Sequence, residues 1–225
     1  MAFELNSVVP WGRNFSEYKD MFMLNDVDLQ KKIAGFGDGP ASFNFEAYKM
    51  GTSVTSYDIV YQFSKEELQH RIEEVRGVVM EQMKENKDNY VWKNIKSIDD
   101  LEKTRMSAMN MFLEDFENGK AEGRYIYHNL PERINAADNT YDIGLSSHFL
   151  LMYTDLGYEF HIRAISEMLR VCREVRIFPV CDLDGIKTEL IDNVKDYFSK
   201  VYNVNLLKTK YEFQKNANKM MVISK

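Results

Sequence analysis

The segment KKIAGFGDGPASFNFEAYKMG, residues 31–51, decides the fold predicted for this chain. It begins as a short buried strand and then places glycines at positions 35, 37 and 39, followed by Pro40. Glycine tolerates a positive φ and lets a ligand approach the backbone, although it costs conformational entropy. The glycines therefore predict either a tight turn or a ligand bound against the main chain. Pro40 suits the first turn of a helix, and Gly51 suits its C-terminal cap.

Strand and helix patterns alternate on both sides of this segment. A possible capping box at Ser64 and Glu67 predicts the start of one helix. Apolar residues at helical spacing predict two more, one whose apolar face ends at Cys172 and one whose apolar face runs from Leu190 to Val201. This alternation favours a doubly wound α/β sheet of about seven strands, with helices on both faces. The predicted strands are residues 31–36, 53–58, 124–129, 141–149, 174–180, 203–213 and 219–225, and the last two can form a hairpin.

The connection between the second and third strands is much longer than one crossover helix needs. A second amphipathic helix over residues 97–119 fits there, with an apolar side from Leu101 to Phe116. We expect one domain over residues 1–225, with an N-terminal cap over 1–30 and a helical insertion over 84–122. The insertion is either an extra helix packed on the sheet or a lid over the site.

Composition excludes several classes of function. The net charge is −6 and the pI is about 5.4, without a basic block, which disfavours nucleic-acid and anionic-membrane partners. No apolar run is long enough for a membrane span, and the N-terminus lacks the pattern of a secretory signal. Cys172 and Cys181, at opposite ends of a predicted strand, are too far apart for a disulfide. We therefore expect a reduced, cytoplasmic protein. The histidines lack metal-ligand spacing, so no metal is predicted.

A ligand at the glycine turn agrees with the predicted sheet, because ligands of doubly wound sheets bind beyond the carboxyl ends of the strands. The dinucleotide pattern G-x-G-x-x-G would require glycine where Pro40 stands, and no P-loop Gly-Lys-Ser/Thr follows. Asp58 ends the second strand. An acid there can bind both ribose hydroxyls of a nucleoside, although a turn or cap aspartate is also common at strand ends.

The spacing G-x-G-x-G, followed by Asp58, resembles motif I of class I S-adenosylmethionine-dependent methyltransferases. Together with VVPWGRNFSEYKDMF, YDIVYQFS, AMNMFLEDFENGKAEGRY, YDIGLSSHFLLMY and EVRIFPV, it is similar to a bacterial, largely uncharacterised group of that family. The resemblance implies a seven-stranded sheet with the last strand antiparallel. It also implies that Gly35, Gly37, Gly39 and Asp58 bind S-adenosylmethionine, which becomes S-adenosylhomocysteine. The acid that usually opens motif I is absent, since Lys31-Lys32-Ile33-Ala34 precedes Gly35.

Further cofactor contacts are predicted from position. Arg13 suits the carboxylate of the cofactor's methionine end, because a guanidinium matches a carboxylate bidentately, but it can also be solvated. Tyr18 and Trp11 can form a wall beside the sulfonium or simply dock the N-terminal segment. Tyr61 can line the adenosine pocket or simply pack in the core. Leu130 is expected beside the adenine, and Ser146 at the end of the fourth strand, where the implied crevice lies.

His148 is predicted to face the methyl acceptor, since the fourth strand neighbours the first in such sheets. It can act as a general base or hold the acceptor by a hydrogen bond. The structural alternative is a histidine that satisfies a nearby carbonyl.

The acceptor itself is not defined by the sequence. Ser146-Ser147-His148-Phe149 stands where nucleic-acid amino methyltransferases often carry an Asn/Asp-Pro-Pro-Tyr segment, so a nucleic-acid acceptor is disfavoured. A small molecule or a protein side chain is expected instead, and of these two the small molecule is favoured. Two other functions remain open. One is a non-catalytic module that binds S-adenosylmethionine or S-adenosylhomocysteine, and the other is a nicotinamide-dependent oxidoreductase, which Pro40 disfavours.

Overall fold

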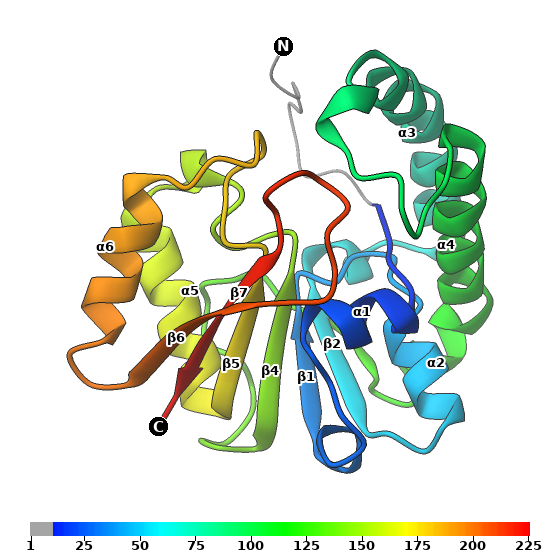
Figure 1. Cartoon of the computed structure of the whole chain (residues 1–225). Helices are drawn as coiled ribbons and strands as arrows, with labels where there is room; N and C mark the ends of the chain where they lie inside the picture. The colour runs from blue at the N-terminus through cyan, green and yellow to red at the C-terminus, as the bar shows by residue number, and fades with distance from the viewer. Residues whose placement is uncertain (1–10) are drawn as a thin grey trace.

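Seven strands form one sheet in the order β3-β2-β1-β4-β5-β7-β6 (Figure 1) in the computed structural model, which describes residues 11–225. β1 to β5 are parallel, and β7 runs antiparallel to both β5 and β6. The predicted α/β sheet with an antiparallel last strand is thus confirmed. The strands are β1 (Ile33–Phe36), β2 (Val54–Asp58), β3 (Tyr125–Tyr127), β4 (Tyr141–Ser147), β5 (Cys172–Phe178), β6 (Asn203–Lys208) and β7 (Lys219–Ser224).

Helices cover both faces of the sheet, because neighbouring strand residues point to opposite sides. Ile33 of β1 packs with α1 and α2, whereas the next residue, Ala34, packs with α5 and α6. Each face therefore has its own apolar core. The helices are α1 (Phe15–Met21), α2 (Phe43–Lys49), α3 (Lys65–Glu85), α4 (Ile98–Ala121), α5 (Tyr158–Val171) and α6 (Glu189–Phe198).

Two helices, α3 and α4, lie between β2 and β3, and α4 falls within the helical insertion expected over residues 84–122. Ser64 and Glu67 form the expected capping box at the start of α3. Leu101 to Phe116 supply the buried side of α4. In Figure 1, α3 stands beyond the carboxyl ends of the parallel strands, and the connection between β6 and β7 lies over the same edge. Backbone hydrogen bonds join this connection to the chain after α3: Val91 N–H donates to the Phe213 carbonyl at 2.6 Å.

Several local predictions are wrong. Pro40 lies in the turn and not in the helix, because α2 begins at Phe43 with Ser42 as its N-cap. Cys172 opens β5 directly after α5 ends at Val171. Val201 follows the end of α6 and is 78% exposed. Gly51, in contrast, has the positive φ of a helix-ending glycine.

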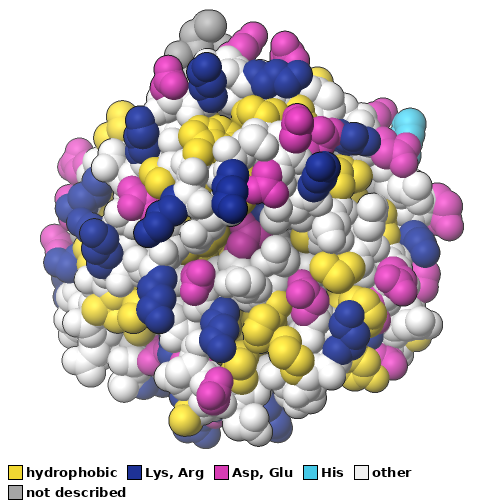
Figure 2. Space-filling view, turned by 45° about the vertical axis from the view of Figure 1, so that its right-hand side comes forward, with side chains coloured by type: hydrophobic (Ala, Val, Ile, Leu, Met, Phe, Trp, Pro, Cys, Tyr) yellow, Lys and Arg dark blue, Asp and Glu magenta, His cyan; other side chains and the backbone are white. Residues whose placement is uncertain are grey.

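Cys172 and Cys181 are both free and buried, as predicted. Within residues 11–225, no helix combines the length and apolar character that a bilayer crossing requires. On the face shown in Figure 2, basic and acidic side chains are interspersed. The first third of the expected N-terminal cap, residues 1–10, lies outside the described residues, as does most of the segment considered as a secretory signal.

Candidate functional site

The glycine turn crosses the carboxyl end of β1 with two left-handed residues. Gly37 has a φ of 70° and Gly39 a φ of 53°. A Cβ added to Gly37 would lie 2.6 Å from Cδ1 of Phe149, so this glycine allows the segment after β4 to pack closely. Nothing lies within 4 Å of a Cβ added to Gly39. Gly39 is therefore the position where a ligand can approach the main chain.

Asp38, between these glycines, turns back over β1. A Cβ on Gly35 would overlap the Asp38 carboxylate, so Gly35 makes room for this side chain. The carboxylate accepts hydrogen bonds from the hydroxyls of Tyr18 at 2.8 Å and Ser56 at 2.7 Å. Burial, with a smaller contribution from the nearby charge of Asp58, raises the pKa of Asp38 to about 6, although these hydrogen bonds act to lower it. Asp38 is thus a buried carboxylate whose charged form a nearby cation would stabilise.

Asp58 ties the end of β2 to the same turn. One carboxylate oxygen accepts the Gly39 N–H at 2.7 Å, and the other accepts the Val60 N–H at 2.8 Å. Burial raises the pKa of Asp58, and these backbone hydrogen bonds oppose the rise. Each oxygen keeps a lone pair for a further donor. The predicted ribose acid is therefore held in a fixed orientation.

A cavity of about 390 Å³, which we call the turn cavity, lies beyond the carboxyl ends of β1, β2 and β4. Its apolar walls include Leu130, Ile59 and Phe149, while Asp38 and Asp58 supply negative charge. The structure brings most of the predicted site residues together here. Those that line the turn cavity are Arg13, Tyr18, Gly37, Gly39, Asp58, Leu130 and His148.

Gly35, Tyr61 and Ser146 do not line the turn cavity. Gly35 is covered by Asp38. The Tyr61 ring is fully buried against Phe112 and Tyr125, and its hydroxyl donates to the Gly39 carbonyl at 2.9 Å, so its contact with the site is indirect. The Ser146 side chain is buried within β4, and strand alternation gives the position on the cavity to Ser147 instead.

His148 follows β4 with a φ of 55°. Its N–H donates to the Phe178 carbonyl at 2.6 Å, and its ring Nδ1 lies 2.9 Å from the Ser147 hydroxyl. Burial, together with the charges of Arg13 and Arg105, holds the pKa of His148 well below its usual range. The ring is therefore a neutral imidazole near physiological pH, suited to hydrogen bonding more than to proton uptake.

Arg13 stands just before α1, at the junction of two cavities. A second cavity, of about 130 Å³, shares Trp11, Arg13 and His148 with the turn cavity. The Arg13 backbone is fixed because its carbonyl accepts the Ser42 N–H at 3.1 Å. Its Nη1 donates to the Trp11 carbonyl at 3.1 Å. Within residues 11–225, no carboxylate forms an ion pair with Arg13.

Sequence reasoning missed Asp38 and the second cavity. Asp38 had a signal, since it is an acid inside the glycine turn of a chain that has no acid directly before Gly35. The second cavity had none, because its walls come from the N-terminal segment, α3, α4 and the β6–β7 connection, which are far apart in the sequence.

Sheet order, glycine turn and cavity together define a protein with the class I methyltransferase fold. The chain belongs to the family of the uncharacterized protein MJ0045 of Methanocaldococcus jannaschii, with 36% identity over 221 residues and 97% of each chain covered. No family model matches the chain. Because this relative is archaeal, the restriction of the resemblance to bacteria is not supported.

Three solved structures are similar at low identity. The PH0226 protein of Pyrococcus horikoshii has a TM-score of 0.49 and 10% identity, over 93% of this chain and 89% of that one. Magnesium protoporphyrin IX methyltransferase of Synechocystis, with bound S-adenosylmethionine, has a TM-score of 0.47 and 11% identity, over 89% and 73%. A putative methyltransferase of Methanococcus maripaludis has a TM-score of 0.41 and 11% identity, over 93% and 82%.

Proposed function

We propose that the protein is an S-adenosylmethionine-dependent methyltransferase that acts on a small molecule. The observation that carries the proposal is Gly39, which has open space beside its Cα and lines the turn cavity together with the buried Asp38 and Asp58. A nucleoside that carries a cationic amino-acid chain matches this arrangement at both ends. The apolar part of the cavity wall that Ile59 and Leu130 form suits the adenine.

The charges of the cavity support this ligand over NAD. The remaining lone pairs of Asp58 can accept the two ribose hydroxyls, and Asp38 suits the ammonium group of the methionine end. A pyrophosphate would meet both carboxylates and would be repelled. The residues present therefore fit S-adenosylmethionine.

When bound, S-adenosylmethionine would supply the methyl group of its sulfonium. The bond from this methyl group to sulfur would break, leaving its electron pair on sulfur, while a new bond forms to the nucleophilic atom of the acceptor. The chain's own part is alignment, which accounts for much of the catalysis in an in-line transfer. His148, at the junction of both cavities, holds the acceptor by a hydrogen bond from its neutral ring. A proton that the acceptor loses passes to water, because the lowered pKa of His148 makes it a weak base.

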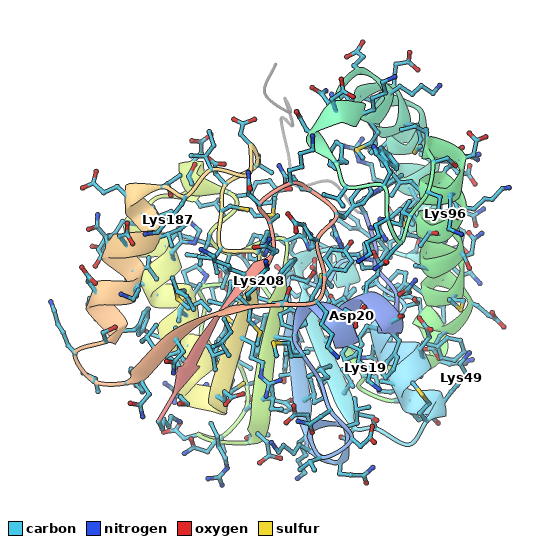
Figure 3. The ribbon with its side chains drawn as sticks, in the orientation of Figure 1. Lys19, Asp20, Lys49, Lys96, Lys187 and Lys208 are labelled. Atoms are coloured by element: carbon cyan, nitrogen blue, oxygen red, sulfur yellow. The ribbon has the colours of Figure 1, made fainter. Side chains whose placement is uncertain are left out.

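Calorimetry tests the binding step. We expect S-adenosylhomocysteine to bind in the micromolar range or tighter, about −8 kcal/mol, and NAD to bind far more weakly. Asp58→Ala should weaken binding by about 1.5–3 kcal/mol through lost charge-assisted hydrogen bonds. Asp20→Ala, at a half-buried position of α1 that does not line the turn cavity (Figure 3), is the matched control and should bind as the wild type does.

A clear isotherm for NAD, with none for either sulfur ligand, would contradict the proposal. Transfer itself is checked by mass spectrometry of small-molecule fractions incubated with the protein and S-adenosylmethionine, where one product should gain a methyl group. Tight binding without any methylated product would favour the non-catalytic binding module.

A further inference from the structure

The second cavity adjoins the turn cavity beside His148. Trp11, Arg13 and His148 line both cavities, so a molecule in the second cavity lies next to a ligand in the first. Its outer wall is the β6–β7 connection, which Val91 and Lys215 join by backbone hydrogen bonds to the chain after α3, at 2.6 and 2.9 Å. The second cavity is thus a defined pocket with walls from several elements.

The arginines of this pocket carry more positive charge than the described residues compensate. Arg105 and Arg13 both line it. Glu17 accepts a hydrogen bond from Arg105 at 2.6 Å and another from the Tyr211 hydroxyl at 2.8 Å. Within residues 11–225, Glu17 is the one carboxylate that pairs with either guanidinium. Two positive charges therefore face one negative charge.

Unpaired hydrogen-bond donors on the two arginines also indicate an anion site at the second cavity. The Nε–H groups of Arg13 and Arg105 are buried and have no hydrogen-bond partner among the described residues. Buried polar groups are almost always paired, so two such donors on neighbouring side chains call for an acceptor. Arg105 lines the second cavity and not the turn cavity. Of these two cavities, the second is the one that both arginines line, so an anion that contacts both would lie there.

The pocket is small, and apart from its arginines, His148 and Gln214 it is lined mainly by aromatic and apolar side chains. Tyr90 and Phe213 stack with their ring centroids 5.0 Å apart, and the side chains of Val79, Met83 and Met152 continue the apolar surface. The volume is about 130 Å³. An apolar cavity of about 150 Å³ holds one benzene molecule, so this space suits one ring.

We propose that the second cavity binds the methyl acceptor, and that this acceptor is a small organic acid. Its single ring packs against Tyr90 and Phe213, and its carboxylate accepts hydrogen bonds from Arg13 and Arg105. The role as acceptor rests on the proposed methyl transfer, whereas the binding of an acid does not. The low pKa of Arg13, which burial and the charge of Arg105 cause, agrees with a guanidinium that lacks its anion.

The alternative is that Arg13 pairs with the carboxylate of the cofactor's methionine end, as the sequence suggested. That arrangement would leave the Arg105 Nε–H unpaired, since Arg105 is absent from the lining of the turn cavity within the part of the chain described. The two assignments predict different effects of the same substitution.

The test compares acids with their uncharged analogues. Benzoate, phenylacetate and 3-phenylpropanoate, each beside its amide, are titrated into protein saturated with S-adenosylhomocysteine, with binding followed by ligand NMR. We expect at least one acid to bind about tenfold or more tightly than its amide, as charge-assisted hydrogen bonds require. Arg13→Met should abolish this preference, and Arg13→Lys should keep part of it. Lys19→Met, on the outer side of α1 (Figure 3), is the matched control and should change nothing.

Binding of cofactor analogues to the Arg13→Met variant separates the two assignments of Arg13. S-adenosylhomocysteine and 5′-methylthioadenosine, which lacks the amino-acid end, should bind Arg13→Met within about threefold of the wild type. A loss confined to S-adenosylhomocysteine would assign Arg13 to the cofactor and overturn the proposal. Equal binding of acids and amides, or no acid binding to protein that holds S-adenosylhomocysteine, would also overturn it. Acid binding without any binding of the sulfur ligands would support the acid pocket and overturn the methyltransferase proposal alone.

Discussion

The Tyr18 hydroxyl donates a hydrogen bond to Oδ1 of Asp38 at 2.8 Å, which joins the N-terminal helix to the glycine turn. The Ser56 hydroxyl holds the other carboxylate oxygen at 2.7 Å. Asp38 is thereby fixed at the turn cavity with Asp58 close enough to raise its pKa. Two buried carboxylates that line the same cavity destabilise the protein without a ligand and favour the binding of a cationic group there.

Asp38→Asn should therefore stabilise the protein and weaken ligand binding. Folding raises the pKa of Asp38 from 3.8 to about 6, so its contribution to stability is fully present below pH 3.8 and is lost as the pH rises through about 6. At about 1.36 kcal/mol per pKa unit, the variant gains up to about 3 kcal/mol near pH 7.5. S-adenosylhomocysteine should bind about tenfold more weakly.

Thermal melts of both proteins between pH 4 and pH 8 measure the first effect, and calorimetry measures the second. The melting temperatures should converge toward pH 4, where the wild-type carboxyl is protonated in both states. A variant less stable than the wild type at pH 7.5 would show that the hydrogen bonds from Tyr18 and Ser56 outweigh the cost of the buried charge.

Gly37→Ala and Gly39→Ala should have different effects, although both place a side chain at positive φ. The methyl of Gly37→Ala meets Phe149, so we expect a marked loss of stability, by about 1–3 kcal/mol or more from strain and overpacking. The methyl of Gly39→Ala points into open space, so its stability loss should be smaller while S-adenosylhomocysteine binding falls strongly. Unchanged affinity in a folded Gly39→Ala variant would remove the turn from the binding site.

Local sequence patterns predicted the parts of this fold that depend on neighbours in the chain. The Ser64–Glu67 capping box and the glycine turn are read from residues a few positions apart, and each forms as expected. Asp58 was found because the end of the second strand is a fixed place in a doubly wound sheet. The seven-strand order with an antiparallel last strand was implied by the resemblance and is confirmed.

Side-chain direction and long-range packing could not be predicted in the same way. Tyr61 follows Asp58 within a 3₁₀ turn, and whether its ring faces the ligand or the core depends on Phe112, which comes from the distant α4. Ser146 and Ser147 are neighbours in β4 and therefore point to opposite faces of the sheet. Which of the two faces the cavity could not be told from the sequence. The pairing of Arg105 with Glu17 joins residues 88 positions apart.

Hydrogen exchange should slow in the insertion when ligand binds. Residues 86–92 contact the β6–β7 connection through few backbone hydrogen bonds, among them Lys215 N–H to the Asn89 carbonyl at 2.9 Å. Segments joined by few backbone hydrogen bonds open easily. A ligand in the second cavity would contact both the chain after α3 and the β6–β7 connection and so stabilise their closed arrangement. We expect slower exchange over 86–92 and 209–218 with S-adenosylhomocysteine and an acid together. The far end of α4, near residues 118–121, is the internal control and should be unaffected; equal protection with and without ligands would favour a plain structural insertion.

The ionisation of His148 gives a prediction that separates a hydrogen-bonding role from general-base catalysis. Burial, Arg13 and Arg105 all favour the neutral ring, so its NMR signals should not titrate between pH 8 and pH 6. In Arg13→Met one of these cations is gone, and the pKa should move up toward 6.5. A wild-type midpoint near pH 6.5 would contradict the arrangement of charges described for the second cavity.

His148→Asn should lower the methyl-transfer rate by about tenfold or more, because the acceptor loses a hydrogen bond that aligns it. Asparagine is the informative replacement, since it tolerates the left-handed φ of 55° better than alanine, whose strain would disturb the end of β4. Cofactor affinity should stay within about threefold, less than about 1 kcal/mol, because Asp38 and Asp58 are untouched. The measurement is single-turnover transfer to whichever acceptor the mass-spectrometric screen identifies, with calorimetry of S-adenosylhomocysteine in parallel. Transfer at the wild-type rate would make His148 a structural residue, fixed by its hydrogen bond to the Phe178 carbonyl.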